Sequence, residues 1–497
     1  MLLLGYDVGS SSIKASIIDA EKGERIGFAL SPGRELPINA PRPGWAEQDP
    51  VVWWRHLKKA TRTLLSENSL DPKRIQAIGI SYQMHGLVVV DRNRKVLRPA
   101  IIWCDGRAVE VGKKAFEELG EEFCLAHYLN SPGNFTASKL RWVKEHEPNV
   151  YAKMHKFMLP GDYITMKLTG NITTTVSGLS EGILWDYQEK ETAYRLLEYY
   201  DIDASLVPPA VTNFSEQGRV TAEAASELGL EAGTGIFYRA GDQPNNALSL
   251  NVLAPGEAAA TAGTSGVIYG VTDRPLYDKH ARVNTFVHVN YGEEQERYGV
   301  LLCINGTGIQ YRWLKDTLLN NSLAYDAMNK LASEVEVGSA GVLVMPFGNG
   351  PERSLENKNI GARIEGIDFN RHSQAHVIRA TQEGIAFAMN YGLQIMQEMG
   401  VPLSTIRVPG DNLFLSPVFA EAFANVTGIE VELYDTTGAQ GAAIGAGIGA
   451  GVFDDREEAF RSLEKAETVI PQKELKRKYD EAYNRWKNEL EEILNTK

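Results

Sequence analysis

Two short motifs near the middle of the chain could do chemistry together. Asp242 stands in a Gly-Asp-Gln turn after an apolar run, and Gly263, Thr264, Ser265 and Gly266 form a loop between two β-rich runs. Small residues let the backbone turn tightly and leave its N–H groups open to an anion. A carboxylate on one lobe and an anion loop on the other predict a cleft where a phosphate meets an acceptor hydroxyl.

A loop of the same design lies near the N-terminus. An apolar run leads to Asp7, and Gly9, Ser10, Ser11 and Ser12 follow before an alternating run. A carboxylate beside a phosphate would repel it unless a cation lay between them, so Asp7 predicts Mg²⁺, held directly or through water. A plain polar hairpin is the alternative for this loop alone. Two matching loops indicate two related α/β halves.

Two further loops carry groups that suit a sugar. Gln83 and His85 lie in a loop between two apolar runs, where α/β folds place ligands, and amide and imidazole groups suit hydroxyl recognition. The second loop combines the aromatic face of Trp103 with the carboxylate of Asp105 and the guanidinium of Arg107. The alternatives are a structural histidine and an Asp105–Arg107 pair that caps the next helix.

Asp242 has the chemistry of a general base. Residues 245–253 are small and apolar and predict a helix with Asp242 at its N-terminus, where the helix dipole favours the ionised carboxylate that a base needs. An N-cap aspartate without a chemical role is the alternative.

The elements around these loops alternate between strands and helices. Asp49 and Pro50 predict the start of a helix that carries Trp53 and Leu57 on one apolar face. The glycine-rich run 438–451 predicts a helix that packs closely on a neighbour.

Composition bounds the class of protein. The 497 residues, 43% of them hydrophobic and 23% charged, predict two globular domains rather than one core. The net charge of −13 argues against nucleic-acid binding, and no apolar run is long enough for a membrane helix. Three scattered cysteines form no zinc or disulfide pattern, which predicts a cytoplasmic location.

Six motifs, in order along nearly the whole chain, together resemble the FGGY carbohydrate kinases, and among these the xylulokinases. They are DVGSSSIK, GWAEQDPVVWW, GISYQMHG, RPAIIWCDGR, GDQPNNA and AGTSG. The resemblance implies an α/β fold of two actin-like, hexokinase-type (ribonuclease H-like) lobes with the active site between them. The expected domains are residues 1–252, which bind the sugar, and residues 253–497, which bind the nucleotide. The implied reaction is ATP-dependent phosphorylation of D-xylulose to D-xylulose 5-phosphate.

The resemblance also implies roles for residues on the sugar side. Asp242 corresponds to the catalytic base of the family. Met84 and His85 correspond to sugar-binding positions, and the loop from Trp103 to Arg107, with Asp105, matches a substrate-side loop.

On the nucleotide side, the resemblance implies ATP and Mg²⁺ as cofactors. Asp7 corresponds to the magnesium element, and the phosphate elements are residues 9–12 and 263–265. Gly410 and Asp411 lie in the stretch 408–414 that matches the adenosine motif. Sugar and ATP are the expected small-molecule partners, and a homodimer remains open.

Two departures from the family pattern leave alternatives open. The turn at Asp242 has the Gly-Asp-Gln form common in glycerol kinases, which keeps ribulose, glycerol or a related polyol as alternative substrates. The stretch 408–414 retains only Gly410 of the usual glycine run. A non-catalytic sugar sensor with an altered nucleotide site is therefore a further alternative.

Overall fold

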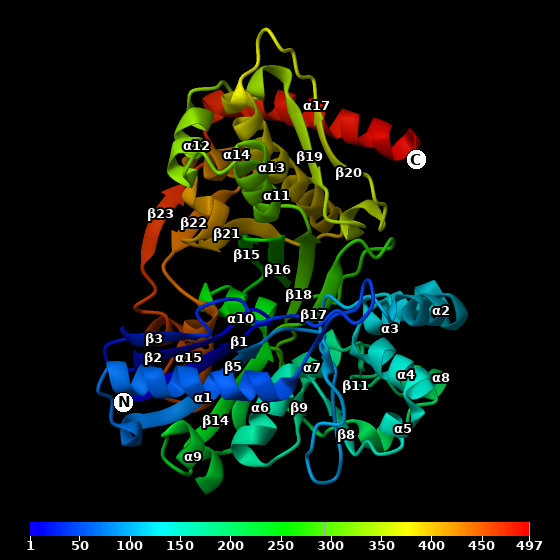
Figure 1. Ribbon diagram of the computed structural model, residues 1–497, viewed down its shortest axis with the longest axis vertical. Coiled ribbons are helices and arrows are strands. Elements are labelled where there is room, and N and C mark those ends of the chain that lie inside the picture. Colours follow the sequence, from blue (N-terminus) through cyan, green and yellow to red (C-terminus); the bar gives the residue numbers. More distant parts are fainter. Residues whose placement is uncertain (293, 497) are drawn as a thin grey trace. The chain divides into compact units, whose positions relative to one another are not determined.

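The computed structural model describes residues 1–292 and 294–496, which divide into two compact units (Figure 1). The first unit comprises residues 1–251, 286–298 and 436–463, and the second comprises residues 252–285, 299–435 and 464–497. Each is an α/β unit with one large sheet, as the sequence predicts. No helix in the described part of the chain is long and apolar enough to cross a membrane.

The first unit is built on a six-stranded sheet of order β13-β14-β5-β1-β2-β3. Its strands β1 and β2 form the predicted hairpin, and β5 runs parallel to both β1 and β14. The bounds are β1 Leu2–Val8, β2 Ile13–Asp19, β3 Arg25–Ser31, β5 Ile75–Tyr82, β13 Phe214–Arg219 and β14 Gly235–Gly241.

Two helices cover opposite faces of this sheet. Helix α1 (Pro50–Glu67) begins as predicted, with the Asp49 carboxylate accepting a hydrogen bond from the Val51 amide at 2.9 Å. Its apolar side packs on the face that carries Tyr6, whose hydroxyl lies 2.8 Å from Thr61 Oγ1. Because side chains alternate across a strand, Gly5 faces the other side, where helix α15 lies.

Helix α15 (Gly438–Gly449) comes from the C-terminal half of the sequence but belongs to the first unit. It packs so closely that a Cβ on Gly5 would overlap the backbone of Ala439 and Ala443. The prediction of a tightly packed helix is confirmed. The first compact unit therefore extends beyond the predicted residues 1–252 to include residues 286–298 and 436–463. The small residues of α15 explain how the second of these segments covers the sheet.

The second unit has a seven-stranded sheet of order β17-β18-β16-β15-β21-β22-β23. Its buried core includes the long helix α13 (Gln374–Glu398) with α14 (Pro417–Thr427) and the final helix α17 (Lys473–Thr496). Trp486 of α17 is fully buried, so the last helix docks as predicted. The strands are β15 Gly256–Ala262, β16 Gly266–Thr272, β17 Asn284–Val287, β18 Tyr298–Ile304, β21 Leu403–Pro409, β22 Glu430–Tyr434 and β23 Lys465–Val469.

Shorter elements complete the two units. Those used below are α4 Thr136–His146, β8 Lys156–Met158, α7 Val176–Glu181, α10 Asp242–Ser249, α11 Gly308–Trp313, α12 Tyr325–Ser333 and a 3₁₀ helix Asn412–Leu415.

Candidate functional site

Three parallel strands of the first unit end together, and two of them bring acidic side chains to that edge of the sheet. Asp7 near the end of β1 pairs in register with Ser81 of β5, and Gly241 at the end of β14 pairs with Tyr82. Asp242 follows directly as the first residue of helix α10. The carboxyl ends of parallel strands are where α/β folds bind ligands, so this edge is the candidate site.

Helix α10 differs from its predicted bounds. It runs from Asp242 to Ser249 rather than over residues 245–253. Pro244 is tolerated because it lies in the first turn, where its missing N–H would have no helical partner. Asp242 nevertheless stands at the helix start, as predicted.

The electrostatics of Asp242 differ from the prediction. Burial, and after it the neighbouring carboxylate of Asp7, raise the pKa of Asp242 to about 7, although hydrogen bonds from Gln243 oppose this shift. The predicted stabilisation of the ionised form is therefore outweighed. A carboxyl group that titrates near neutral pH suits proton transfer at that pH.

Asp7 is the predicted magnesium ligand, and its surroundings fit that ion. Its Oδ2 atom lies 3.1 Å from Lys14 Nζ, and its Oδ1 atom lies 3.5 Å from Ser81 Oγ. Among residues 1–292 and 294–496 there is no group of three or more metal-ligating side chains. Mg²⁺ at phosphate sites usually takes only one or two carboxylates, with water and phosphate oxygens as its other ligands. Asp7 beside Asp242 fits this pattern.

The first predicted phosphate loop, residues 9–12, is a tight turn between β1 and β2. The Gly9 amide donates to the Ser12 carbonyl at 3.1 Å, and Ser11 is exposed. Ser10 is held from two sides, since Gln48 Nε2 donates to its carbonyl at 2.7 Å and Trp103 Nε1 lies 3.4 Å from its hydroxyl. The structure thus brings the phosphate loop and the Trp103 loop together.

Met84 and His85 follow β5 and lie close to the turn before Asp242. Met84 is buried, and its Cγ atom would lie 2.5 Å from a Cβ on Gly241. His85 has a left-handed backbone (φ 60°), and its Nδ1 atom lies 2.8 Å from the Glu181 carbonyl oxygen. The ring of Phe135 packs edge-on against the His85 ring, with 4.8 Å between the two ring centres. Met84 therefore lies against the turn before Asp242, and the ring of His85 is held by Glu181 and Phe135.

The Trp103 loop has one exposed member and two buried ones. Trp103 is 48% exposed, while the side chains of Asp105 and Arg107 are fully buried and paired at 2.7 Å. The Asp105 carboxylate also accepts from the Ala46 amide at 2.5 Å. The Asp105–Arg107 pair that the sequence left as an alternative is present, but it does not cap the next helix, Val109–Leu119, which has no side-chain cap. The assignment of Asp105 and Arg107 as sugar contacts stays a prediction.

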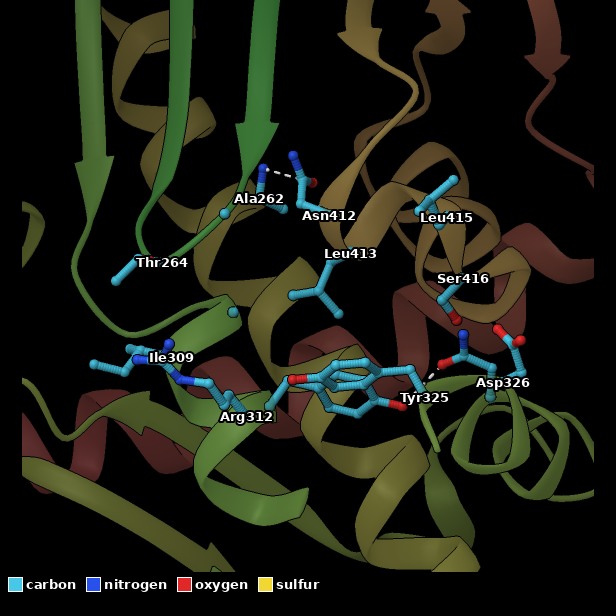
Figure 2. A pocket seen from close by; sticks show the side chains of 14 residues that line it. Ala262, Thr264, Ile309, Arg312, Tyr325, Asp326, Asn412, Leu413, Leu415 and Ser416 are labelled. Carbon is cyan, nitrogen blue, oxygen red and sulfur yellow. Dashed lines mark hydrogen bonds between the residues drawn. The ribbon is translucent and has the colours of Figure 1, made fainter. Parts of the chain in front are cut away.

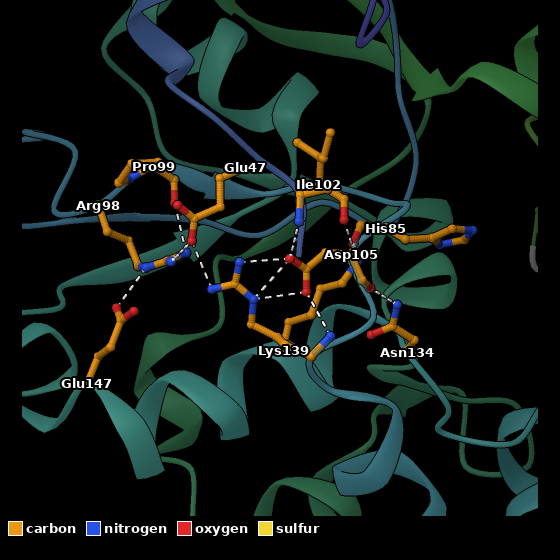
Figure 3. A network of polar contacts seen from close by, with 11 residues as sticks. Glu47, His85, Arg98, Pro99, Ile102, Asp105, Asn134, Lys139 and Glu147 are labelled. Atoms are coloured by element: carbon orange, nitrogen blue, oxygen red, sulfur yellow. Dashed lines mark hydrogen bonds and ion pairs between the residues drawn. The ribbon is translucent and has the colours of Figure 1, made fainter. Parts of the chain in front are cut away.

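The Arg107 guanidinium is enclosed by tryptophans and joins a wider ionic network. It lies 3.8 Å from the ring centre of Trp45 and 4.9 Å from that of Trp142, and its Nη1 atom lies 2.8 Å from Glu47. Arg98 pairs with the same Glu47 carboxylate at 2.6 Å and with Glu147 at 2.7 Å (Figure 3). The network fixes the loop that carries Trp103.

Two buried residues near the site were missed by the sequence reasoning. Lys139 of α4 is fully buried and lies against both sugar loops. Glu181, at the end of α7, is 1% exposed, and burial with the charge of Asp242 raises its pKa well above the ordinary value. No local signal predicts either, because lysine and glutamate are ordinarily surface residues.

The second unit contains a cavity of about 320 Å³ (Figure 2). Leu413 and Tyr325 lie on two sides of it, and only two of its 14 lining residues, Arg312 and Asp326, carry charge. The lining residues come from the end of β15, from α11, from α12 and from the 3₁₀ helix: Ala262, Gly263, Thr264, Gly308, Ile309, Tyr311, Arg312, Tyr325, Asp326, Asn329, Asn412, Leu413, Leu415 and Ser416.

The cavity unites part of the predicted nucleotide motifs. Gly263 and Thr264 line it, and their carbonyls accept hydrogen bonds from Thr307 Oγ1 at 3.0 and 3.2 Å. The stretch 408–414 reaches it through Asn412, whose Oδ1 atom accepts from the Ala262 amide at 3.2 Å.

Ser265, Gly410 and Asp411 were also predicted for this site but are not among the cavity lining. The cavity residues from 308–312 and 325–329 were missed by the sequence reasoning. The Asn-Gly-Thr-Gly run directly after β18 was the available signal for the first group.

Comparison with known proteins matches both parts of the chain to one family. Residues 2–249 match the N-terminal domain of the FGGY family of carbohydrate kinases, and residues 258–452 match its C-terminal domain. The xylulose kinase of Bacillus subtilis is 28% identical over 496 residues, covering 98% of this chain and 96% of that protein. The xylulose kinase of Escherichia coli is 27% identical over 467 residues, covering 93% of this chain and 92% of that protein.

Solved structures share the two-domain α/β fold. A "xyloylose kinase" from Brucella ovis superposes with a TM-score of 0.90 at 26% identity, and the xylulose kinase from Rhodospirillum rubrum with 0.88 at 25%, each covering 100% of both chains. The glycerol kinase of Plasmodium falciparum, solved with ADP, has the same fold, with a TM-score of 0.88 at 20% identity over 99% of this chain and 98% of that one.

Proposed function

Because this chain belongs to the FGGY family of carbohydrate kinases, we propose that it phosphorylates D-xylulose with ATP to give D-xylulose 5-phosphate. The similarity to xylulose kinases over nearly the whole chain supports this sugar. The observation that carries the proposal is the position of Asp242, which begins a helix beside Asp7 at the carboxyl edge of the first sheet.

Asp242 is the proposed general base. It orients the acceptor hydroxyl and takes its proton late in the transfer, since phosphoryl transfer depends mostly on positioning and charge stabilisation. A pKa of about 7 supports this role, because the group then accepts and releases a proton near neutral pH.

The proposed sugar site lies in the first unit around Met84, His85 and Trp103. Trp103 offers an exposed aromatic face to the apolar side of a sugar, and His85 offers a ring held by its Nδ1 contact. Asp105 and Arg107 are buried against each other, so we assign them to holding the Trp103 loop in place.

The proposed nucleotide site lies in the second unit. A cavity of about 320 Å³ with a mostly neutral lining suits an adenosine group. The amides of residues 263–265 are the proposed phosphate ligands of this unit, and those of residues 9–12 are the proposed phosphate ligands of the first unit. Gly410 and Asp411 are proposed to shape the backbone beside the cavity.

Mg²⁺ is the proposed metal, held by Asp7 and by the phosphates. When bound, it would neutralise charge on the phosphate oxygens. The chain's own part is to present the Asp7 carboxylate, which Ser81 and Lys14 orient.

The test is ADP release across a panel of ketopentoses, aldoses and polyols, with ATP and other nucleotides compared. We expect D-xylulose with ATP to have the highest kcat/KM, and mass spectrometry with ³¹P NMR to identify a 5-phosphate product. A polyol as the best substrate would move the chain to another kinase activity of the family. Sugar binding without ADP release would make it a sensor and overturn the proposal.

A further inference from the structure

One buried lysine bonds to the backbone of both proposed sugar loops. Lys139 lies on α4 with 0% of its surface exposed, and its Nζ atom donates to the His85 carbonyl at 2.8 Å and to the Ile102 carbonyl at 3.1 Å (Figure 3). His85 belongs to the loop after β5, and Ile102 immediately precedes Trp103. A single ammonium group therefore joins two loops that are separate in sequence.

This arrangement has a cost in stability. Desolvation is the main reason that the pKa of Lys139 falls to about 7, and the nearby Asp105 carboxylate opposes the fall. A buried charge is destabilising unless it is well compensated, and apolar replacements of buried ionic groups are often neutral or stabilising. Stability of the fold is thus a weak reason for placing a lysine here.

The first carbonyl that Lys139 holds belongs to a strained residue. His85 has φ 60°, a conformation that a side chain with a Cβ rarely adopts without support. Lys139 bonds to its carbonyl, and the Glu181 carbonyl lies 2.8 Å from its Nδ1 atom. Backbone and ring are thus fixed by separate contacts, which sets the direction of the imidazole.

The second carbonyl that Lys139 holds, that of Ile102, helps to set the position of the exposed Trp103. Ile102 is fully buried, whereas Trp103, the next residue, is 48% exposed and reaches Ser10 Oγ at 3.4 Å. A bond to the Ile102 carbonyl sets the point at which the chain leaves the core. The position of the indole follows from that point.

We propose that Lys139 is a positioning residue for the acceptor sugar, because its ammonium group holds the His85 and Trp103 loops in one relative geometry. The inference rests on the proposed function for the identity of the ligand. Lys139 does not touch the sugar itself; it acts through the two carbonyls. A loss of about 1 Å in the placement of reacting groups can cost about 100-fold in rate.

The test compares Lys139→Met with a matched control, Lys156→Met. Lys156 on β8 also donates to two carbonyls, those of Ser205 at 2.6 Å and Val207 at 2.9 Å, but neither belongs to a proposed sugar loop. The full-length variants are compared by steady-state kinetics with D-xylulose and ATP, by calorimetric sugar binding without nucleotide, and by thermal unfolding.

For Lys139→Met we expect the KM and the Kd for the sugar to rise about 10- to 100-fold, while the KM for ATP stays within about twofold. Lys156→Met should leave both KM values within about twofold. If Lys139→Met does not fold, Lys139→Arg carries the same test, since it keeps the charge but moves the donors. An unchanged sugar Kd in the folded variant would overturn the inference, whatever its melting temperature.

The two proposals fail in different ways. If the wild type releases no ADP with any sugar, the proposed kinase activity fails, and calorimetry still decides whether Lys139 controls sugar binding. If the wild type is active and Lys139→Met matches Lys156→Met in sugar Kd, the kinase activity stands and the positioning role is wrong.

Discussion

The two proposed binding regions are built on opposite principles. In the first unit, the loops at His85 and Trp103 rest on buried ions, among them the fully buried pair of Asp105 and Arg107. In the second unit, the cavity near Leu413 has an almost neutral lining. A small, hydroxylated ligand offers few atoms, so its site needs rigid loops. A larger, flatter ligand is bound by shape, and a neutral cavity suffices.

This difference predicts where each unit is vulnerable. A buried ionic network is weakened when one partner is removed, because the remaining buried charges are then compensated less fully. A neutral cavity loses little from one polar change, because each hydrogen bond contributes only about 1 kcal/mol. Substitutions in the first unit should therefore act sharply, and those in the cavity should act gradually.

The largest effect on kcat is expected from a substitution of Asp242, because this residue is proposed to act in the chemical step more than in binding. Asp242→Asn should lower kcat about 10²- to 10⁴-fold, because the amide cannot take the hydroxyl proton. The sugar KM should change by no more than about threefold. The matched control is Asp49→Asn, another acid at a helix start in the same unit. Near-normal kcat in Asp242→Asn, measured by ADP release, would remove Asp242 from the mechanism.

The next largest effect tests the ionic network directly. Asp105→Asn should lower the free energy of unfolding by up to about 3 kcal/mol, because the buried Arg107 guanidinium then keeps Glu47 as its acidic partner but loses Asp105. It should also raise the sugar KM. Urea denaturation gives the stability, and Glu117→Gln, in an exposed pair with Lys113 at 4.0 Å, should leave it nearly unchanged. Equal stability of the two variants would contradict the dependence of the first unit on its buried ionic network.

The pH dependence of stability tests Glu352, a buried acid of the second unit that accepts hydrogen bonds from backbone amides. Glu352 accepts from the Asn305 amide at 2.9 Å, and burial raises its pKa from 4.5 to about 7. The folded state then holds a proton that the unfolded state has lost, so stability falls as the pH rises from about 5 to about 7 and levels off above 7.

Between pH 5 and pH 8, the wild type should lose on the order of 2–3 kcal/mol relative to Glu352→Gln. The unfolding transition of the second unit, followed in urea at each pH, measures this difference. For the control variant Glu334→Gln, which changes an exposed acid, the curve of stability against pH should run parallel to that of the wild type. Parallel curves for Glu352→Gln as well would show that the buried acid does not carry the dependence.

The smallest effect is expected in the cavity. Asn412→Ala removes the acceptor of the Ala262 amide and should raise the ATP KM about 5- to 10-fold, with the sugar KM unchanged. Ser404→Ala is the control, because Ser404 Oγ donates to the Gly256 carbonyl at 3.0 Å. This bond also links β15 and β21, but at the start of the two strands, away from the cavity. A 100-fold rise in the ATP KM of Asn412→Ala would mean that the cavity is as sensitive to a single substitution as the ionic loops.

Local patterns in the sequence predicted much of the fold. The helix start at Asp49 and Pro50, the hairpin after Asp7 and the docked helix with Trp486 are all confirmed. Each depends on neighbours in sequence: a cap, an alternation or an apolar stripe. The Asp105–Arg107 pair, which the sequence offered as an alternative, was likewise readable from one short loop.

What could not be predicted depends on contacts between distant segments. The raised pKa of Asp242 arises from burial and from Asp7, 235 positions earlier in the chain, and no helix-dipole argument contains either. Lys139 was missed because nothing near it in sequence marks it as buried. The contacts of Met84 and His85 with the sugar, and of Gly410 and Asp411 with the nucleotide, stay predictions.

Helix α15 has a consequence for how the protein is made. It covers a face of the first sheet and lies against Gly5 and Gly79, yet it ends only at Gly449. During translation, that face waits uncovered until nine-tenths of the polypeptide has left the ribosome. A gene cut after residue 252 would yield a fragment with an open apolar surface, which calls for a chaperone or for the missing segment supplied in trans.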